Sequence, residues 1–434
     1  MAHTLPAPFF PHKYKSICPL TLVPFYPYGY TAPLSVCQEY LTRAAMTIAF
    51  RRTRFTWLAY FMLGYFAYIE AAFGPLIPFL RDELNLNYTL SGMHFSAFAL
   101  GLVLSGFITD RIAAILGRPK TFWVGALGMA LASFLLLAFR HVALTISASF
   151  LIGLIGSWLL VMIQSTLSDE HGANRAVALT ESNIMASVAA GLVPAITGWG
   201  AGTVIGWRAG LWAGILMALL ITVIYARTPF PAPTPADEDE PTAGNGKPLP
   251  LAFWAYWASL IFNIAIEWCI ILWSAGFLEE VIGFEKEAAA ASVSIIFVAM
   301  VIGRTVGSRM TRRYLPSVIL PYALGIVALG FPLLWLGTSH IIALVGLFIV
   351  GLGIANFYPL TLAAAINIAP QQADRISARM TLGAGVAILF APQILGTLAD
   401  ALGLHTAFMT VIVLVLASAI TLWLGHRLRK RKGV

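Results

Sequence analysis

Residues 55–80, FTWLAYFMLGYFAYIEAAFGPLIPFL, form an apolar run that contains a single carboxylate, Glu70. At about 1.5 Å of rise per residue, a helix of this length crosses a hydrocarbon core of roughly 30 Å and places Glu70 near its middle. An ionised acid at that depth costs about 3 kcal/mol, so such acids usually face the protein interior or water and serve a function. The stretch therefore predicts a transmembrane helix with a functional acid.

The composition of the whole chain indicates a membrane protein. Hydrophobic residues make up 59% of the 434 residues, charged residues only 11%, and the mean hydropathy is +0.82. This is far from the composition of a soluble globular domain. The net charge of +8 comes from short basic clusters between apolar runs, which argues against nucleic acid as a partner. Cys18, Cys37 and Cys269 have no metal-ligand spacing, so we expect no metal site, no disulfide framework and no cofactor.

Apolar runs of membrane-spanning length can be counted along the chain from Phe55 onward. They predict twelve spans, at approximately residues 55–80, 89–109, 120–139, 142–166, 176–199, 207–226, 251–277, 288–308, 316–337, 340–363, 378–398 and 405–425. The longest break between runs is rich in proline and contains an acidic stretch, residues 237–240, and it reads as a linker between two halves of six spans.

The domain organisation follows from these spans. The predicted fold class is an all-α polytopic membrane protein with twelve transmembrane helices in two pseudo-symmetric six-helix bundles. Residues 1–54 are expected to be a largely disordered extension and basic lead, with Met46 as a possible true start. The remaining segments are an N-terminal bundle at 55–226, a cytoplasmic linker at 227–250, a C-terminal bundle at 251–426 and a basic cytoplasmic tail at 427–434.

The distribution of Lys and Arg predicts the orientation. An even number of spans puts both termini on one side, and the loops and ends of that side hold most of the 27 basic residues. The opposite loops hold only four, which are Arg81, Arg140, Arg208 and Lys286. The positive-inside rule therefore predicts a multi-pass protein of the inner or plasma membrane with both termini in the cytoplasm.

An internal repeat relates the two halves. Residues 175–198 align with residues 375–396, and each segment places a proline four residues before a glycine. A parallel repeat of this kind is found in some secondary transporters. Extended to the first span of each half, the alignment puts Glu70 opposite Glu267, with a difference of one residue in their offsets to the following Phe-Leu pair.

The loop between the second and third spans resembles a signature of the major facilitator superfamily, G-x-x-x-D-R-x-G-R-K. The matching residues are Gly106, Asp110, Arg111, Gly117, Arg118 and Lys120. The sequence departs from the signature where residues 112–116 separate Asp-Arg from Gly-Arg and where Pro119 interrupts the final basic pair. The resemblance covers residues 55–425 and implies that this loop is a conformational latch, in which Asp110 accepts hydrogen bonds at a helix end across the interface between the halves.

The resemblance also implies that the first, fourth, seventh and tenth spans line a central cavity, and that the two bundles rock against each other. The polar residues of these spans, together with Glu181 of the fifth span, are the candidates for the substrate and proton pathway. They are Glu70, Glu267, Asn263, Tyr68, Trp268, Gln164, Asn356, Tyr358 and Glu181. Glu70 and Glu267 are the strongest candidates, whereas a tyrosine, tryptophan or asparagine in a span also serves as an interfacial anchor or an interhelical hydrogen bond.

Three charged residues, Glu181, Arg304 and Arg379, have more than one interpretation each. Glu181 lies six residues after Arg175 and can pair locally or relay protons. Arg304 and Arg379 can act in gating, and each can also serve an anionic solute if it faces inward, while Arg304 can alternatively form a structural pair or snorkel.

The function expected from these features is secondary active transport of a small solute by alternating access, coupled to protons as symport or antiport. No H-E-x-x-H, Gly-x-Ser-x-Gly or P-loop pattern is present, so we expect neither an enzyme nor an ATP-driven pump. The alternatives are a nontransporting sensor on a transporter scaffold and a drug-type efflux carrier. The expected partners are a solute, protons and the lipid bilayer, and the expected state is a monomer.

Overall fold

The computed structural model describes residues 50–231 and 248–431. Residues 1–49 of the expected extension and residues 232–247 of the expected linker therefore lie outside the described residues, and Arg54, placed in the extension, begins the first helix. Within the described ranges every regular element is a helix and no strand occurs.

Helix α2 (Arg54–Leu84) contains the apolar run of residues 55–80. It begins at a capping box, in which the Thr53 side chain accepts a hydrogen bond from the Thr56 N–H and the Thr56 hydroxyl accepts one from the Thr53 N–H. It ends at Asn85, whose left-handed backbone (φ 52°) returns its N–H to the last turn. Because α2 is apolar on all sides, it is buried on all sides, and 83% of its most apolar window lies inside the protein.

The other helices of the N-terminal half follow in chain order. They are α3 (Tyr88–Ser105), the short loop helix α4 (Thr109–Leu116), α5 (Arg118–Ala138), α6 (Val142–His171), α7 (Arg175–Ala201) and α8 (Ala209–Tyr225). A 3-10 turn at Gly172–Asn174 joins α6 to α7.

The C-terminal half repeats this order, with three of its spans each built from two consecutive helices. Its helices are α9 (Leu251–Glu280), α10 (Lys286–Ser292) with α11 (Ser294–Met310), α12 (Pro316–Trp335), α13 (His340–Ile354) with α14 (Phe357–Ile366), α15 (Ala373–Leu402), and α16 (Leu404–Ala407) with α17 (Met409–Arg431).

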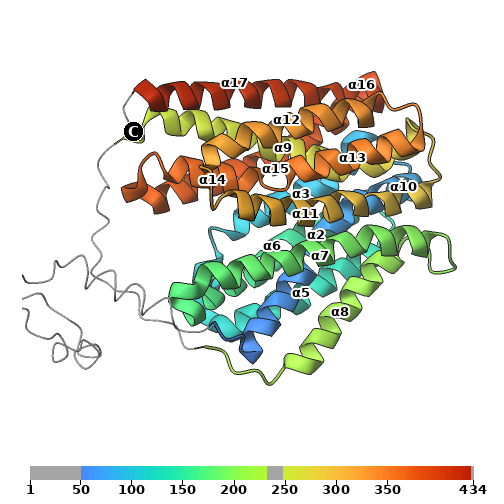
Figure 1. Cartoon of the computed structure of the whole chain (residues 1–434). Helices are drawn as coiled ribbons and strands as arrows, with labels where there is room; N and C mark the ends of the chain where they lie inside the picture. The colour runs from blue at the N-terminus through green and yellow to red at the C-terminus, as the bar shows by residue number, and fades with distance from the viewer. Residues whose placement is uncertain (1–49, 232–247, 432–434) are drawn as a thin grey trace, which may run out of the picture. The chain divides into compact units, whose positions relative to one another are not determined.

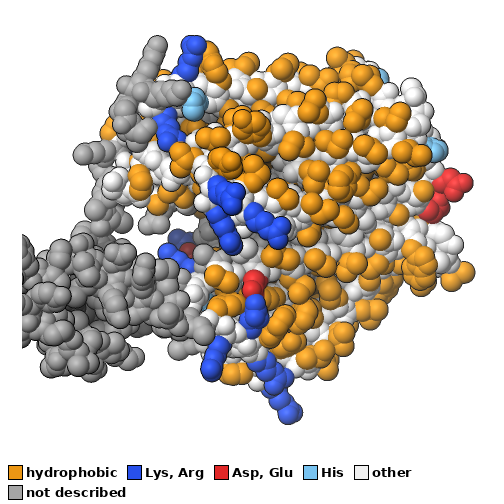
Figure 2. All heavy atoms as spheres, viewed as in Figure 1, with side chains coloured by type: hydrophobic (Ala, Val, Ile, Leu, Met, Phe, Trp, Pro, Cys, Tyr) orange, Lys and Arg blue, Asp and Glu red, His pale blue; other side chains and the backbone are white. Residues whose placement is uncertain are grey.

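The twelve predicted spans correspond to these elements. Eleven helical segments in the described part of the chain are long and apolar enough to cross a membrane, and α8, an apolar helix of 17 residues, occupies the place of the remaining predicted span. The prediction of an all-α polytopic membrane protein with two six-helix bundles is confirmed. Large apolar side chains cover much of the outer surface, as Figure 2 shows.

Figure 1 shows the two halves as neighbouring layers, with the helices of the N-terminal half (blue to green) beside those of the C-terminal half (yellow to red). The halves meet where α3 packs on α15, where α7 packs on α10 and α11, and where α2 packs on α9. We call the end that holds the start of α2 and the end of α17 the terminal end, and the opposite end the distal end.

The repeat-related glycines Gly198 and Gly396 both lie at contacts between the halves. A Cβ atom on Gly198 would collide with the Glu287 carbonyl oxygen of α10. A Cβ atom on Gly396 would lie 2.9 Å from the Tyr88 carbonyl oxygen of α3 and 2.8 Å from the Trp273 ring. The two glycines therefore permit the same kind of close helix approach on the two sides of the interface.

Candidate functional site

Glu70 and Glu267 lie near the middle of the two central helices, α2 and α9, one in each half. Both side chains are half-buried, and the two helices that carry them pack against each other. Neither carboxylate makes a hydrogen bond or an ion pair with any residue that the structure describes. The structure thus places two acids, each without a partner among the described residues, on the central helices of opposite halves. That the two share one central site stays a prediction.

Arg304 of α11 is a basic group whose positive charge acts on Glu267. Its Nε donates a hydrogen bond to the Ala355 carbonyl oxygen at 3.2 Å. Its terminal nitrogen donates to the Ser187 hydroxyl of α7 and so links the two halves near the middle of the membrane. Arg304 therefore lies inside the protein and does not snorkel to the surface.

Aromatic and amide groups complete the central region. The Trp268 ring lies 4.8 Å from the Phe95 ring of α3, measured between ring centroids, and so contacts the opposite half. The Trp158 indole nitrogen of α6 is buried without a partner among the described residues. Gln164 of the same helix is exposed, and its amide makes no hydrogen bond within the described residues. Two polar side chains of α6 are thus left without an internal partner.

Asn263 and Tyr68 have partners inside their own halves. The Asn263 side chain is fully buried, accepts a hydrogen bond from the Ser418 hydroxyl of α17 at 2.7 Å and donates to Thr361 of α14 at 3.4 Å. The Tyr68 hydroxyl donates to the Gly210 carbonyl oxygen of α8 at 2.8 Å. These contacts are interhelical hydrogen bonds of the kind that hold membrane helices together.

The tenth span is interrupted between α13 and α14, and Asn356 and Tyr358 lie at this break. The Asn356 amide donates to the Gly303 carbonyl oxygen of α11 at 2.7 Å. The Tyr358 hydroxyl lies 3.2 Å from the hydroxyl of Thr381 on α15. Both side chains are half-buried, and each links the break in the tenth span to a neighbouring helix.

Glu181 and Arg379 lie closer to the terminal end. Glu181 forms an ion pair with Arg52 at 2.5 Å and accepts a hydrogen bond from the Tyr60 hydroxyl at 3.0 Å. Its partner is therefore Arg52, at the start of α2, and no ion pair with Arg175 occurs within the described residues. The Arg379 guanidinium lies 5.3 Å from the centre of the Trp254 ring, a cation–π contact within the C-terminal half.

The signature loop lies at the terminal end. Gly106 ends α3, the inserted residues form α4, and Gly117 begins α5 with a positive φ of 82°. Arg118 forms an ion pair with Asp169 of α6 at 2.5 Å. Asp110, Arg111 and Lys120 are exposed, and Asp110 makes no hydrogen bond or ion pair with the described residues. In this arrangement the loop is anchored to its own half.

The distal end carries contacts that our reading of the sequence missed. Arg81 pairs with Glu280, and Tyr88 donates a hydrogen bond to the same carboxylate. Lys286 pairs with Asp82 and with Glu279. A signal was present in the repeat, because the residues after Phe79-Leu80 are Arg-Asp and those after Phe277-Leu278 are Glu-Glu.

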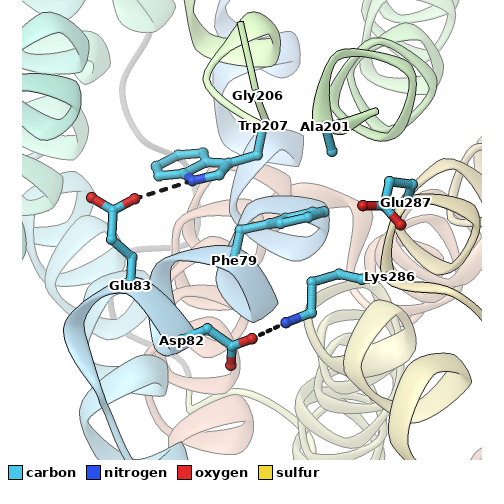
Figure 3. Close-up of a pocket in the computed structure, with 8 residues that line it drawn as sticks. All are labelled: Phe79, Asp82, Glu83, Ala201, Gly206, Trp207, Lys286 and Glu287. Carbon is cyan, nitrogen blue, oxygen red and sulfur yellow. Dashed lines mark hydrogen bonds and ion pairs between the residues drawn. The ribbon is translucent and has the colours of Figure 1, made fainter. Parts of the chain in front are cut away.

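A surface depression of about 430 Å³ lies beside these contacts. Figure 3 shows that it is formed by the end of α2, the turn between α7 and α8 and the start of α10, with Phe79 at its floor and the Asp82–Lys286 pair at its edge. Glu83 accepts hydrogen bonds from Trp207 and Arg208. Most polar groups that line the depression are thus already paired, and the depression lies away from the two central acids.

The described part of the chain contains no group of three or more His, Cys, Asp or Glu side chains that could hold a metal ion. The fold is that of a polytopic membrane protein built from helices. The sequence pattern of the Major Facilitator Superfamily matches residues 56–343, and the chain belongs to this family of transporters, whose members are not enzymes.

Two relatives of known sequence match over most of the chain. An uncharacterized MFS-type transporter of Yersinia pestis is 26% identical over 375 residues, which is 84% of this chain and 93% of the relative. A glucose/galactose transporter of Brucella abortus is 26% identical over 378 residues, which is 82% of this chain and 89% of the relative.

Solved structures of the same fold include a bacterial homolog of the human lysosomal transporter Spinster in an inward-facing, unoccupied conformation. It has a TM-score of 0.67 at 15% identity and matches 87% of this chain and 97% of its own. A D-xylose–proton symporter has a TM-score of 0.67 at 12% identity and matches 86% of this chain and 96% of its own. These likenesses show the fold.

Proposed function

We propose that this protein is a proton-coupled secondary transporter of a small polar solute that works by alternating access. The observation that carries the proposal is the placement of Glu70 and Glu267 in the middle of α2 and α9, where neither carboxylate has a partner among the described residues. Unpaired acids inside a membrane protein are expensive, and they commonly mark proton relays and solute pathways.

The coupling rests on the repulsion between two neighbouring acids. When both carboxylates are ionised in a site of low dielectric, they repel each other, and binding of one proton relieves this repulsion. The acids belong to opposite halves, so their charge state acts on the relative position of the halves. Proton binding and the rocking movement are therefore linked.

The solute class follows from the charges of the same region. Two acids and one base, Arg304, favour a neutral or cationic solute over an anion. Trp268, which follows Glu267 in the chain, provides a flat apolar surface, and Trp158 of α6 provides an indole donor that has no partner among the described residues. We therefore propose a neutral polar solute first, and the 26% identical glucose/galactose transporter makes monosaccharides the first class to test.

The proposed location is the cytoplasmic membrane, with the terminal end facing the cytoplasm. The four basic residues expected on the outer side lie at the ends of helices at the distal end, where Arg81, Arg140, Arg208 and Lys286 all form ion pairs. The excess of Lys and Arg at the terminal end supports this orientation. The protein acts as a monomer, with residues 55–226 and 251–426 as the two moving bundles and Asp110 as part of the latch loop.

The test is transport by purified protein in proteoliposomes under an imposed pH gradient. A thermal-shift screen of sugars, amino compounds, organic acids and lipophilic cations first identifies the solute, because a bound ligand stabilises the folded state. We expect Glu70→Gln to abolish uphill, pH-driven transport and to leave downhill counterflow. Glu285→Gln, which changes an exposed glutamate at the distal end, is the matched control and should retain uphill transport.

Three outcomes would count against the proposal. Uphill transport that survives in Glu70→Gln would remove this acid as a proton carrier. Lost solute binding with retained proton coupling in Glu267→Gln would mean that Glu267 holds a cationic solute group. The absence of saturable flux and counterflow with every solute that stabilises the protein would favour a nontransporting sensor.

A further inference from the structure

The start of α3 is capped by a residue of the opposite half. The first N–H groups of a helix have no partner within the helix. Asn87, the local N-cap, accepts a hydrogen bond from only one of them, the Leu90 N–H, at 2.8 Å. The N–H groups of Tyr88 and Thr89 donate instead to the two carboxylate oxygens of Asp400, each at 2.8 Å.

Asp400 belongs to the last turn of α15, in the C-terminal half. Its carboxylate also accepts a hydrogen bond from the Thr89 hydroxyl at 2.5 Å. A carboxylate at a helix start gains both from these hydrogen bonds and from the positive end of the helix dipole. Because the donors and the acceptor lie in different halves, this cap can form only when the distal end is closed.

The rest of the α3–α15 contact holds Asp400 in position. Gln393 lies two turns earlier on α15, and its amide donates to the Thr89 carbonyl oxygen at 3.1 Å. Ser96 of α3 donates to the Leu389 carbonyl oxygen at 2.9 Å. Gly92 and Gly396 allow the two helices to approach, since a Cβ atom on either would lie within 3 Å of the facing helix.

The interactions between the halves are concentrated toward this end. Among the described side chains, all hydrogen bonds and ion pairs between the two halves lie at the distal end or near the middle of the membrane. At the terminal end, Asp110 follows the end of α3 and makes no such contact, and Gln372, the N-cap of α15, forms no capping hydrogen bond. Among the side chains that the structure describes, the acid that joins α3 and α15 in this state is therefore Asp400.

We propose that Asp400 is a latch that holds the distal end closed by capping α3, and that the latch must release each time the distal end opens. The inference rests on the proposed alternating-access function. In this role Asp400 shifts the equilibrium between the distal-closed and distal-open states toward the closed state. It does not bind the solute or the proton.

The test measures the opening of the distal end directly. Spin labels are placed at Val204, in the turn between α7 and α8, and at Thr338, between α12 and α13, in a background that lacks the native cysteines. The distance distribution is measured in nanodiscs for the parent, Asp400→Ala and Asp400→Asn. Since loss of a helix cap weakens a helix start measurably, we expect Asp400→Ala to raise the ratio of open to closed molecules about threefold to tenfold.

Glu83→Gln is the matched control. Like Asp400, Glu83 has a carboxylate at the distal end. It forms ion pairs with Arg140 and Arg208, which both belong to its own half. It should leave the distance distribution unchanged, and Asp400→Asn should lie between the parent and Asp400→Ala. If Asp400→Ala does not fold, Thr89→Val, which removes one of the three contacts, should shift the distribution in the same direction by a smaller amount.

The latch is refuted if the Asp400 variants show the parent's distance distribution, or if Glu83→Gln shifts it equally. The proposed function is judged separately, by transport of the unlabelled parent. A shifted distribution without any transported solute would support the latch and count against the transport function. Normal transport by the parent, together with an unshifted distance distribution in the Asp400 variants, would support the transport function and refute the latch.

Discussion

Arg81 and Glu280 form an ion pair that joins the ends of the two central helices, α2 and α9, across the interface between the halves. The two side chains are 15% and 31% exposed, so water screens their attraction only in part. Arg81 also lies over the Tyr88 ring, with its guanidinium carbon 4.6 Å from the ring centre, and Tyr88 donates to Glu280. The repeat-related ends of α2 and α9 thus carry opposite charges.

Reversal of one charge of this pair should open the distal end. We expect Arg81→Glu to raise the ratio of open to closed molecules about threefold to tenfold, because two carboxylates would then face each other across the interface. The double variant Arg81→Glu/Glu280→Arg should restore most of the closed population. The measurement is the distance between spin labels at Val204 and Thr338, and a double variant that stays as open as the single one would contradict the pairing.

Replacement of Arg304 should slow transport. Arg304→Lys keeps the positive charge but cannot reproduce the fork that reaches both Ala355 and Ser187, so we expect the initial rate to fall roughly tenfold. Ser187→Ala, which removes only one acceptor, should have a smaller effect in the same direction. Arg309→Lys on the exposed face of α11 is the control, and an equal loss in that variant would remove the argument for Arg304.

Removal of the Asn263 side chain should affect stability more than transport. Interhelical hydrogen bonds in membranes contribute about 0.6 kcal/mol each on average, and Asn263→Leu breaks the bonds to Ser418 and Thr361. We expect the melting temperature to fall by about 2–6 °C and KM to change less than about twofold, since both partners lie within the C-terminal half. A large rise in KM at unchanged stability would instead place Asn263 in the solute pathway.

Gly396 should not tolerate a side chain. A Cβ atom there would meet the Tyr88 carbonyl oxygen and the Trp273 ring, so Gly396→Ala should separate α3 from α15 and lower the melting temperature. Gly325→Ala is the matched control, because Gly325 is also helical and no atom lies within 4 Å of its added Cβ. Alanine is the better helix former by about 1 kcal/mol, so this control should be neutral or stabilising. Equal effects of the two substitutions would mean that packing is not the cause.

Much of the fold could be predicted because it depends on local composition. Apolar runs long enough to cross a bilayer must form helices there, since no water is available for unpaired backbone groups. The twelve spans follow from this requirement. The repeat and the related positions of Glu70 and Glu267 follow from the similarity between the two halves of the sequence. The partners of polar residues could not be predicted in the same way. Glu181 lies six residues from Arg175 but pairs with Arg52, which is 129 residues away along the chain.

Hydrophobicity and repetition along the chain were enough to predict the membrane setting, the number of spans, the relation between the halves and the presence of an acid in the first span of each half. Only the tertiary structure decided that Asn263 bonds to Ser418, that Arg304 reaches Ser187 and that Asp400 caps α3. Such contacts join residues far apart in sequence, and their formation depends on how the helices pack and on which end of the molecule is closed.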